Sequence, residues 1–377
     1  MAKPKKYFDI KDLITQFPKT RYFFILGGRS TGKTYSVLKQ SIDDAIDGKG
    51  MFAYVRRYKD SISQTQLQDL CSVHNQHIYD KTDGKYNRII YYRSRWYLEQ
   101  YDYEANKRVY RSPEPVGAAL AINTWETSKG PDIGASYGGI QNIILDEALS
   151  KGGNYLKGEF DLFQNVISSL VRDRTEQTTR IYMLANPVSR WSSEYFDNLG
   201  ITQKMLDKAN TTLIKYPDSD MSLVFCYMTN QVLQNDNSVY NTYFAFPNSR
   251  LKNRSITDGI WELDDSARLP KGVYGNSTNI KTISIYFAQK TYKAEIMRDN
   301  NTGVYYVVYS PTKDIKEKEY FLINQPILSK YAIILSRGKN QQNPLYRLLV
   351  QISQTGQVYY SDNATADAIR GFYNTLK

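Results

Sequence analysis

The chain has 377 residues, of which 41% are hydrophobic and 23% charged, so it is long enough for two domains and apolar enough to bury a sizeable core. Lysine and arginine number 49 against 38 aspartate and glutamate, a formal net charge of +11 that favours a polyanionic partner. No apolar run approaches the roughly 18 residues of a membrane span, which argues against a transmembrane protein.

Cysteine and histidine are scarce in this chain. Cys71, Cys226, His74 and His77 are the only such residues, too few for a disulfide framework or a zinc site, so any metal must be bound by oxygen ligands. Residues 1–10, MAKPKKYFDI, lack the apolar segment of a secretory signal. We expect a soluble cytoplasmic protein with no membrane partner.

The first half of the chain alternates apolar strands with helical segments. A strand at 22–26 (YFFIL) stops at a glycine pair, and the apolar residues of 33–46 recur at helical spacing. Further strands are expected at 51–55, 116–122, 140–145 and 180–185. This alternation predicts an α/β domain, residues 1–197, with a mostly parallel sheet covered by helices.

The remaining segments have a different character. Residues 89–110 are crowded with aromatic and charged side chains, which predicts an inserted antiparallel hairpin with a turn near 104–107. The polar stretch 198–228 is expected to be a linker. Beyond it, strands around the turn DNNTG at 299–303, a strand at 331–335 and a terminal helix predict a second α+β domain, residues 229–377.

Residues 27–34, GGRSTGKT, satisfy the full G-x-x-x-x-G-K-[ST] pattern of a phosphate-binding loop. In such a loop the glycines let consecutive amides face phosphate oxygens, the lysine neutralises the β- and γ-phosphates, and the threonine hydroxyl reaches Mg²⁺. A glycine-rich turn with a surface lysine is the alternative, and the flanking strand and helix argue against it. The nucleotide contacts expected from this loop are Gly27, Gly28, Arg29, Ser30, Thr31, Gly32, Lys33 and Thr34.

A second motif is the apolar run 143–145 followed by Asp146 and Glu147. At the carboxyl end of a strand, Asp146 would hold Mg²⁺ and Glu147 would polarise the attacking water, whereas the alternative is a solvated acidic turn. The separation from Lys33 requires at least one intervening strand. This favours the ATPase class with an added catalytic glutamate over kinases and small GTPases.

Other polar residues near strand ends are candidates with open alternatives. Asn186 could sense the γ-phosphate or simply form an Asn-Pro turn. Arg172, with Arg174 two residues on, could be an arginine finger for the next subunit or part of a solvated helix end. Arg56, Arg57 and Lys59 after the strand 51–55, and Lys151 and Lys157 after Glu147, could grip nucleic-acid phosphates or be ordinary surface residues.

Taken in order, GGRSTGKT after YFFIL, MFAYVRRYK, INTWETSKG, IILDE, LVRDR and MLANP resemble the DNA-packaging motor ATPases of small protein-primed (phi29-like) bacteriophages, relatives of the terminase large subunits. The resemblance covers roughly residues 20–190. It implies a homo-oligomeric ring of five subunits that docks on the portal of a prohead in the host cytoplasm and drives double-stranded DNA inward with ATP and Mg²⁺. A structural RNA of the prohead and the terminal protein on the genome are further partners that it allows.

The resemblance also assigns roles position by position. It implies trans-acting roles for Arg172 and Lys129 and DNA-facing roles for Arg56 and Lys59. The loop after Glu147 departs from the family pattern, because only Lys151 lies within five residues of the glutamate. It implies that Lys33 and Thr34 contact the phosphates and Mg²⁺. It also implies that Asp146 is the metal carboxylate and Glu147 the catalytic glutamate.

The resemblance further implies a second domain similar to a ribonuclease H that has lost its acids. The expected first strand, 283–290, contains no aspartate or glutamate, and a two-metal nuclease needs clustered carboxylates. We therefore expect no DNA cleavage. Two rival hypotheses stay open: a terminase-type ATPase with an active nuclease, and an ATP-binding nucleic-acid scaffold without motor activity.

Overall fold

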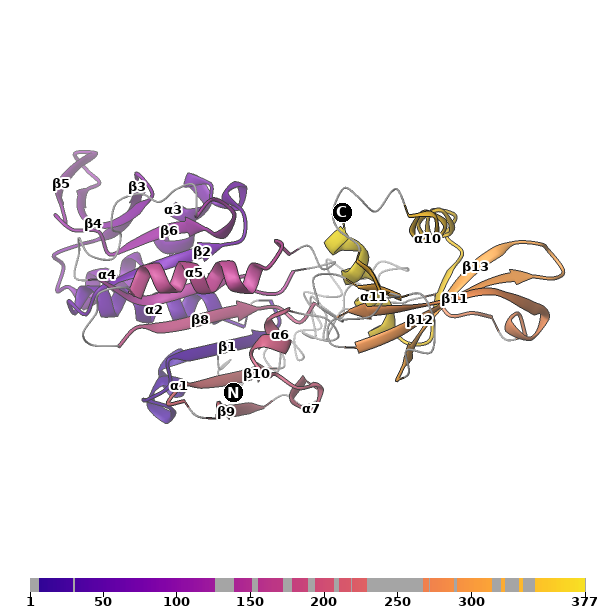
Figure 1. Ribbon diagram of the computed structural model, residues 1–377. Coiled ribbons are helices and arrows are strands. Elements are labelled where there is room, and N and C mark those ends of the chain that lie inside the picture. The colour runs from indigo at the N-terminus through magenta and orange to yellow at the C-terminus, as the bar shows by residue number, and fades with distance from the viewer. Residues whose placement is uncertain are drawn as a thin grey trace, which may run out of the picture. The chain divides into compact units, whose positions relative to one another are not determined.

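The computed structural model describes residues 7–29, 31–125, 139–150, 155–171, 178–188, 194–206, 210–217, 219–228, 267–270, 272–287, 290–313, 320–322, 332–334 and 343–376. They form two compact units (Figure 1). The first unit comprises Met1–Ser150, Tyr155–Val188 and Asn198–Glu262; the second comprises Lys151–Asn154, Ser189–Asp197 and Leu263–Lys377.

The first unit contains a ten-stranded sheet with the order β3-β4-β6-β2-β7-β8-β1-β10-β9, and β5 pairs with β4. Its five inner strands run parallel and confirm the five expected from the apolar runs. These strands are β1 (Tyr22–Gly27), β2 (Met51–Arg56), β6 (Gly117–Ala121), β7 (Ile140–Asp146) and β8 (Arg180–Ala185).

The inner strands are buried on both faces, which explains why their sequences are continuous apolar runs. Phe23, Ile25 and Ile144 have no exposed surface, and they share one core with Val37 and Ile42 of helix α2. Helix α2 (Lys33–Ile46) has the predicted bounds, and it packs against β2, β7 and β8. The sheet and α2 therefore fix the ends of β1, β7 and β8 relative to one another.

The other helices of this part of the chain are shorter or lie between sheet strands. Asp9 caps the first helix by accepting a hydrogen bond from the backbone N–H of Lys11. The helices are α1 (Ile10–Gln16), α3 (Gln64–Ser72), α4 (Asn75–Lys81), α5 (Glu159–Val171), α6 (Glu194–Asn198) and α7 (Gln203–Leu206).

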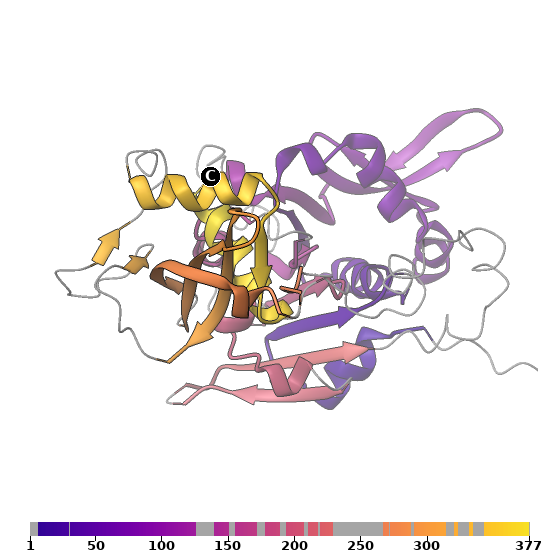
Figure 2. The ribbon, with the colours of Figure 1, turned by 90° about the vertical axis from the view of Figure 1, so that its right-hand side faces the viewer.

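The expected hairpin at 89–110 is instead three antiparallel strands, β3 (Arg88–Tyr92), β4 (Arg95–Asp102) and β5 (Lys107–Arg111). The predicted turn joins β4 to β5. A second, two-residue turn at Arg93 and Ser94 joins β3 to β4, with both residues at positive φ. Figure 2 shows the β4–β5 ribbon extending away from the rest of the unit.

The prediction of a linker at 198–228 is wrong, because this stretch contains two strands of the first sheet. Strand β10 (Ser222–Met228) pairs in parallel with β1 along its length, and β9 (Thr211–Lys215) pairs antiparallel with β10. Leu223, Val224 and Phe225 are fully buried. The polar residues around this short apolar run hid its strand character in the sequence.

The second unit contains a six-stranded sheet with the order β15-β14-β11-β12-β13-β16. Strands β11, β12 and β13 are antiparallel, and β14 and β15 continue the sheet in parallel beyond β11. The predicted turn at 299–303 joins β12 to β13. The bounds are β11 (Ser277–Phe287), β12 (Lys290–Asp299), β13 (Tyr305–Thr312), β14 (Tyr320–Leu322), β15 (Ala332–Ile334) and β16 (Val358–Tyr360).

Helices α10 (Pro344–Gln354) and α11 (Asn363–Leu376) supply the helical part of the second core. Leu349 and Phe372, for example, pack in one cluster with Ile285, Ile296 and Val307 of the sheet. The unit is α+β, as the sequence predicts. Within the described ranges, no helix is both long and apolar enough to cross a membrane.

Candidate functional site

The glycine loop joins the end of β1 to the start of α2. Gly32 lies at the N-cap of α2 with φ of 90°, a left-handed conformation that favours glycine. Gly27 differs from the prediction, because a side chain at this position would need only the flexible end of Met228 to move. It does not have a left-handed φ; instead, a Cβ atom there would lie 2.9 Å from Cε of Met228 on the adjacent strand.

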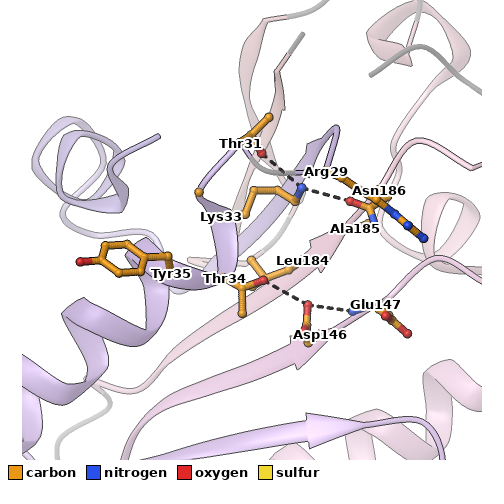
Figure 3. A pocket seen from close by; sticks show the side chains of 11 residues that line it. Arg29, Thr31, Lys33, Thr34, Tyr35, Asp146, Glu147, Leu184, Ala185 and Asn186 are labelled. Carbon is orange, nitrogen blue, oxygen red and sulfur yellow. Dashed lines mark hydrogen bonds between the residues drawn. The ribbon is translucent and has the colours of Figure 1, made fainter. Parts of the chain in front are cut away.

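Lys33 is the first residue of α2 and its ammonium group lies inside the loop (Figure 3). Its Nζ donates hydrogen bonds of 2.7 Å to each of the carbonyl oxygens of Gly27 and Gly28, and one of 3.2 Å to Oδ1 of Asn186. Lys33 is only 7% exposed, and this burial lowers its pKa to about 8 against the opposing attraction of Asp146. The ammonium is thus held by neutral acceptors that a phosphate could replace.

Asp146 is the last residue of β7, and three neighbouring groups orient its carboxylate. The hydroxyl of Thr34 lies 3.5 Å from Oδ1, and the backbone N–H of Glu147 donates to the same oxygen at 3.1 Å. Tyr54 of β2 donates its hydroxyl to Oδ2 at 2.6 Å. Burial and the carboxylate raise the pKa of Tyr54 well above its usual value, so this hydroxyl stays protonated and donates.

Arg56, at the end of β2, bridges the two acids. Its guanidinium lies 3.2 Å from Oδ2 of Asp146 and 2.8 Å from Oε2 of Glu147. Glu147 has φ of 58° and its side chain is 58% exposed, so it reaches from a strained turn toward solvent. Arg56 was expected to face DNA, and the structure shows it paired with the candidate metal and catalytic carboxylates.

A buried ion pair supports the turn that carries Glu147. Arg57 contacts Glu159 through Nε at 2.6 Å and through a terminal nitrogen at 2.8 Å. The same guanidinium donates to the carbonyl oxygens of Glu147 at 3.2 Å and Ala148 at 3.0 Å. Because Glu159 is fully buried and each group has a partner, the pair fixes the backbone after β7. Arg57 was a candidate for gripping nucleic-acid phosphates, and the structure instead pairs it with Glu159. Sequence reasoning assigned no role to Glu159 or Tyr54.

The predicted intervening strand is confirmed, because β8 lies between β1 and β7 in the sheet. Asn186 directly follows β8 and therefore reaches Lys33 from the neighbouring strand end. This position follows from the parallel order of the strands, whose carboxyl ends meet at one edge.

These side chains converge on a cavity of about 310 Å³ at the carboxyl edge of the sheet (Figure 3). Hydroxyl and carboxylate oxygens face each other at Thr34 and Asp146, the donor type that Mg²⁺ prefers. The cavity is lined by Arg29, Thr31, Gly32, Lys33, Thr34, Tyr35, Asp146, Glu147, Leu184, Ala185 and Asn186.

Several predicted site residues do not line this cavity. Lys59 is exposed in a short 3-10 helix after β2, with its backbone N–H bonded to Asn123. Five other candidates lie outside the described residues: Ser30, Lys129, Lys151, Arg172 and Arg174.

The chain is similar in sequence and in fold to proteins of known function. No family model matches the chain. DNA packaging proteins of Bacillus phage PZA and Bacillus phage phi29 are each 24% identical over 203 residues, which is 52% of this chain and 52% of theirs. The chain therefore spans about half the length of the curated relatives it matches.

Two solved structures share the fold along nearly the whole chain. The Phi-28 gp11 DNA packaging motor matches with a TM-score of 0.55 and 17% identity, covering 99% of this chain and 98% of that one. The phi29 viral genome packaging motor assembly matches with a TM-score of 0.57 and 14% identity, covering 98% and 99%. The fold is thus the mixed α/β fold of such motor subunits. The resemblance to the DNA packaging proteins of phi29-like phages is confirmed.

Proposed function

We propose that this chain hydrolyses ATP and uses the energy to move double-stranded DNA into a phage prohead. One observation carries the proposal: an ammonium, a hydroxyl and two carboxylates, from Lys33, Thr34, Asp146 and Glu147, converge on one cavity at the carboxyl edge of a parallel sheet. This is the set of groups that phosphoryl transfer needs for positioning and charge stabilisation. The resemblance to phage packaging proteins supplies the DNA substrate.

Each of these residues has a separate role in the proposed hydrolysis. Phosphate oxygens replace the carbonyl partners of Lys33, whose ammonium neutralises their charge. Thr34 and Asp146 would hold Mg²⁺, which when bound offsets the negative charge that develops on the phosphates. Glu147 orients the attacking water and accepts its proton. The guanidinium of Arg56 lies 2.8 Å from Oε2 of Glu147, so an attacking water would have to replace Arg56 at this oxygen.

The strand order supports the finer assignment to the P-loop class with an added catalytic glutamate. Strand β8 separates the glycine-loop strand β1 from the acidic strand β7, and it brings Asn186 to Lys33. Asn186 would thereby report the state of the γ-phosphate to β8.

The second unit is assigned to a ribonuclease-H-like domain without nuclease activity. Three antiparallel strands followed by two parallel ones, in the order β13-β12-β11-β14-β15, support the fold assignment. Strand β11 carries no aspartate or glutamate, which supports the loss of metal-dependent cleavage.

Assembly and DNA contacts complete the proposal. The subunits form a ring of five on the portal, and Arg172 and Lys129 act on the nucleotide of the neighbouring subunit. Lys59 and Lys151 contact DNA phosphates without base preference, so binding should weaken steeply as salt rises. A structural RNA of the prohead and the terminal protein on the genome are proposed as further partners, and the host cytoplasm as the place of assembly.

Glu147→Gln tests the catalytic assignment. ATP hydrolysis is measured with and without duplex DNA for wild type, for Glu147→Gln and for the control Glu104→Gln, an exposed glutamate in the β4–β5 turn. We expect at least a 10²-fold loss for Glu147→Gln only, with nucleotide binding retained. Wild type that hydrolyses nothing above background on portal and DNA would overturn the motor function and favour a nucleotide-binding scaffold.

Mixed rings test the role of Arg172. Arg172→Ala subunits are mixed with Lys33→Ala subunits, and hydrolysis is compared with that of each variant alone. If Arg172 acts in trans, mixing restores part of the activity, because some interfaces combine an intact loop with an intact arginine. Absence of rescue in rings shown to be mixed would make Arg172 a structural residue.

A further inference from the structure

A second functional surface lies on the antiparallel strands β3, β4 and β5, apart from the nucleotide cavity. Successive residues on a strand point to opposite faces. Trp96 and Leu98 of β4 are buried in the main core. The other face of these strands carries tyrosines and arginines around Glu99, together with Ile90 and Arg95. We call its tyrosines and its arginines from β3 and β5 the tyrosine–arginine face: Arg88, Tyr92, Tyr97, Tyr101, Arg108 and Arg111.

The strand register brings these side chains together from three strands. Arg88 lies opposite Glu99, Arg111 lies opposite the same glutamate from the other side, and Arg108 lies opposite Tyr101. Paired residues on neighbouring strands share a face, so the set forms one continuous surface. Strand β5 pairs with β4 alone, and the ribbon extends from the unit (Figure 2).

One buried carboxylate fixes the two central guanidinium groups. Glu99 has a side-chain exposure of 1%, and it accepts hydrogen bonds from Nε and a terminal nitrogen of Arg88 and, at 3.1 and 3.0 Å, from the same two positions of Arg111. Two arginines share one negative charge, which leaves this cluster with a net positive charge. Each guanidinium keeps one terminal nitrogen that has no carboxylate partner among the described residues.

The guanidinium groups are also stacked on the tyrosine rings. Arg88 lies 3.5 Å from the centre of the Tyr101 ring, and Arg111 lies 5.0 Å from that of Tyr92 and 5.8 Å from that of Tyr97. The side chains of Arg88 and Arg111 are 26% and 25% exposed and Tyr92 is 40% exposed. Flat cationic and aromatic groups are therefore ordered and open to solvent before any partner binds.

We propose that the tyrosine–arginine face binds single-stranded nucleic acid, with phosphates on the arginines and a base stacked on the exposed ring of Tyr92. Ordered guanidinium groups bind phosphate at little cost in side-chain entropy. The exposed ring of Tyr92 can stack on an unpaired base but not on the bases of a duplex, which are already stacked on one another. The inference goes beyond the proposed function and does not depend on ATP hydrolysis.

The charge of the ribbon supports the same partner. Arg108 and Lys107 are exposed on β5, and within the described part of the chain neither has a carboxylate partner. Lys107 lies opposite Asp102, and Tyr110, which is 45% exposed, lies opposite Gln100, so both belong to the other face of the ribbon. A strand with this composition is a poor contact for an apolar or a cationic partner and a good one for a polyanion.

The test uses the full chain without nucleotide and measures fluorescence anisotropy of labelled oligo-dT, of oligo-U and of a duplex of the same length. The double variant Tyr92→Leu/Arg108→Gln removes one exposed ring and one exposed charge from the face. The control Tyr79→Leu/Lys19→Gln removes one tyrosine ring and one positive charge elsewhere in the first unit, where Tyr79 is 46% exposed and Lys19 is exposed.

We expect wild type to bind a single strand, of either sugar, more tightly than the duplex. The face variant should bind it about tenfold more weakly and the control variant as wild type does. Arg108→Gln alone, a surface substitution that cannot disturb the core, should reduce the slope of log affinity against log salt by about 0.7. Absence of single-strand binding, equal effects of the face and control variants, or duplex binding that is as tight and equally affected would each overturn the proposal.

Discussion

The first unit places charged side chains at the ends of its parallel strands, whereas the second unit buries neutral hydroxyls among its strands and helices. At the edge of the first sheet, Lys33 and Asp146 face one cavity. In the second unit the hydroxyls of Tyr309 and Tyr373 lie 2.7 Å apart, with Tyr309 fully buried. Both units are sheets packed with helices, so the difference lies in the side chains that the strands carry.

This comparison shows that the architecture alone does not produce a site. Glu295, a glutamate on the second sheet, is 8% exposed and is held by Lys293 and by the hydroxyl of Tyr274, each at 3.0 Å. Asp146 has a tyrosine and an arginine as partners too, but it also faces the hydroxyl of Thr34 across the cavity. The position of a carboxylate relative to a cavity, more than its partners, separates a reactive group from a structural one.

The largest effect is expected for Lys33→Ala, which removes the cation from the cavity. Hydrolysis should fall about 10³-fold, because the phosphates lose the only ammonium among the described lining residues. Lys39→Ala, on the same helix but outside the cavity, is the control. Steady-state hydrolysis and binding of a fluorescent ATP analogue are the measurements. Equal losses of hydrolysis in both variants would show that a change in the helix, and not the loss of the Lys33 ammonium, is the cause.

Acid should act on the two units differently, because both histidines of the chain lie in the first. His74 is fully buried, and burial, with smaller contributions from His77 and Lys39 against Asp43, lowers its pKa from 6.5 to about 4. The unfolded chain therefore binds a proton at a pH where the folded one does not. The stability that the folded state gains from keeping His74 neutral is fully present above pH 6.5 and is lost as the pH falls toward 4. Over this range the free energy of unfolding decreases by about 1.4 kcal/mol per pH unit.

His74→Phe isolates this contribution, since the new ring can still pack against Tyr35, 4.4 Å from the imidazole centroid. Urea unfolding at pH 7 and pH 5 should show wild type losing about 2 kcal/mol more than the variant. The transition of the second unit should be the same in both proteins. A wild type and variant with the same pH dependence would contradict a buried neutral His74.

A smaller effect is expected for Tyr54→Phe, which removes the hydrogen bond to Asp146 and keeps the packing. The Mg²⁺ concentration for half-maximal hydrolysis should rise about tenfold, because a ligand that loses its orienting partner binds metal more weakly. Tyr182→Phe on β8, which is separated from β2 by β7, is the control. Its hydroxyl is buried and has no hydrogen-bond partner among the described residues. A similar rise in both variants would mean that Tyr54 only supports packing.

Local sequence patterns predicted the elements that depend on local physics. The bounds of α2 follow from a glycine start and a helical apolar period, and the inner strands follow from their apolar runs. The glycine loop and the acidic pair Asp146 and Glu147 were identified because each sits directly after such a strand. The turn at Arg93 and Ser94 was missed because neither residue is a typical turn former at positive φ.

Contacts between strands could not be predicted in the same way. The register that pairs Val55 with Leu145 places Arg56 beside Asp146, and this register depends on the order of strands in the finished sheet. A sequence shows only that Arg56 follows an apolar run, which is equally compatible with a DNA-facing loop. The same holds for Arg57, whose partner Glu159 is 102 residues away.

The last prediction is the absence of an effect: we expect the second unit to have no nuclease activity. Supercoiled plasmid incubated with the full chain and Mn²⁺ should be nicked no faster than in buffer. Two-metal cleavage needs clustered carboxylates. Strand β11 has no acid, and the described residues contain no group of three or more histidine, cysteine, aspartate or glutamate side chains that could hold a metal.

Nicking that increases with protein concentration and persists through further purification would contradict this expectation. It would favour a terminase-type enzyme, and the comparison between the two units would then be between two active sites. Glu295→Gln would show whether its carboxylate, held by Lys293 and Tyr274, takes part. If the plasmid stays intact, the proposed ATP hydrolysis by the first unit is the only reaction to explain. The second unit then has a binding role and does not cleave DNA.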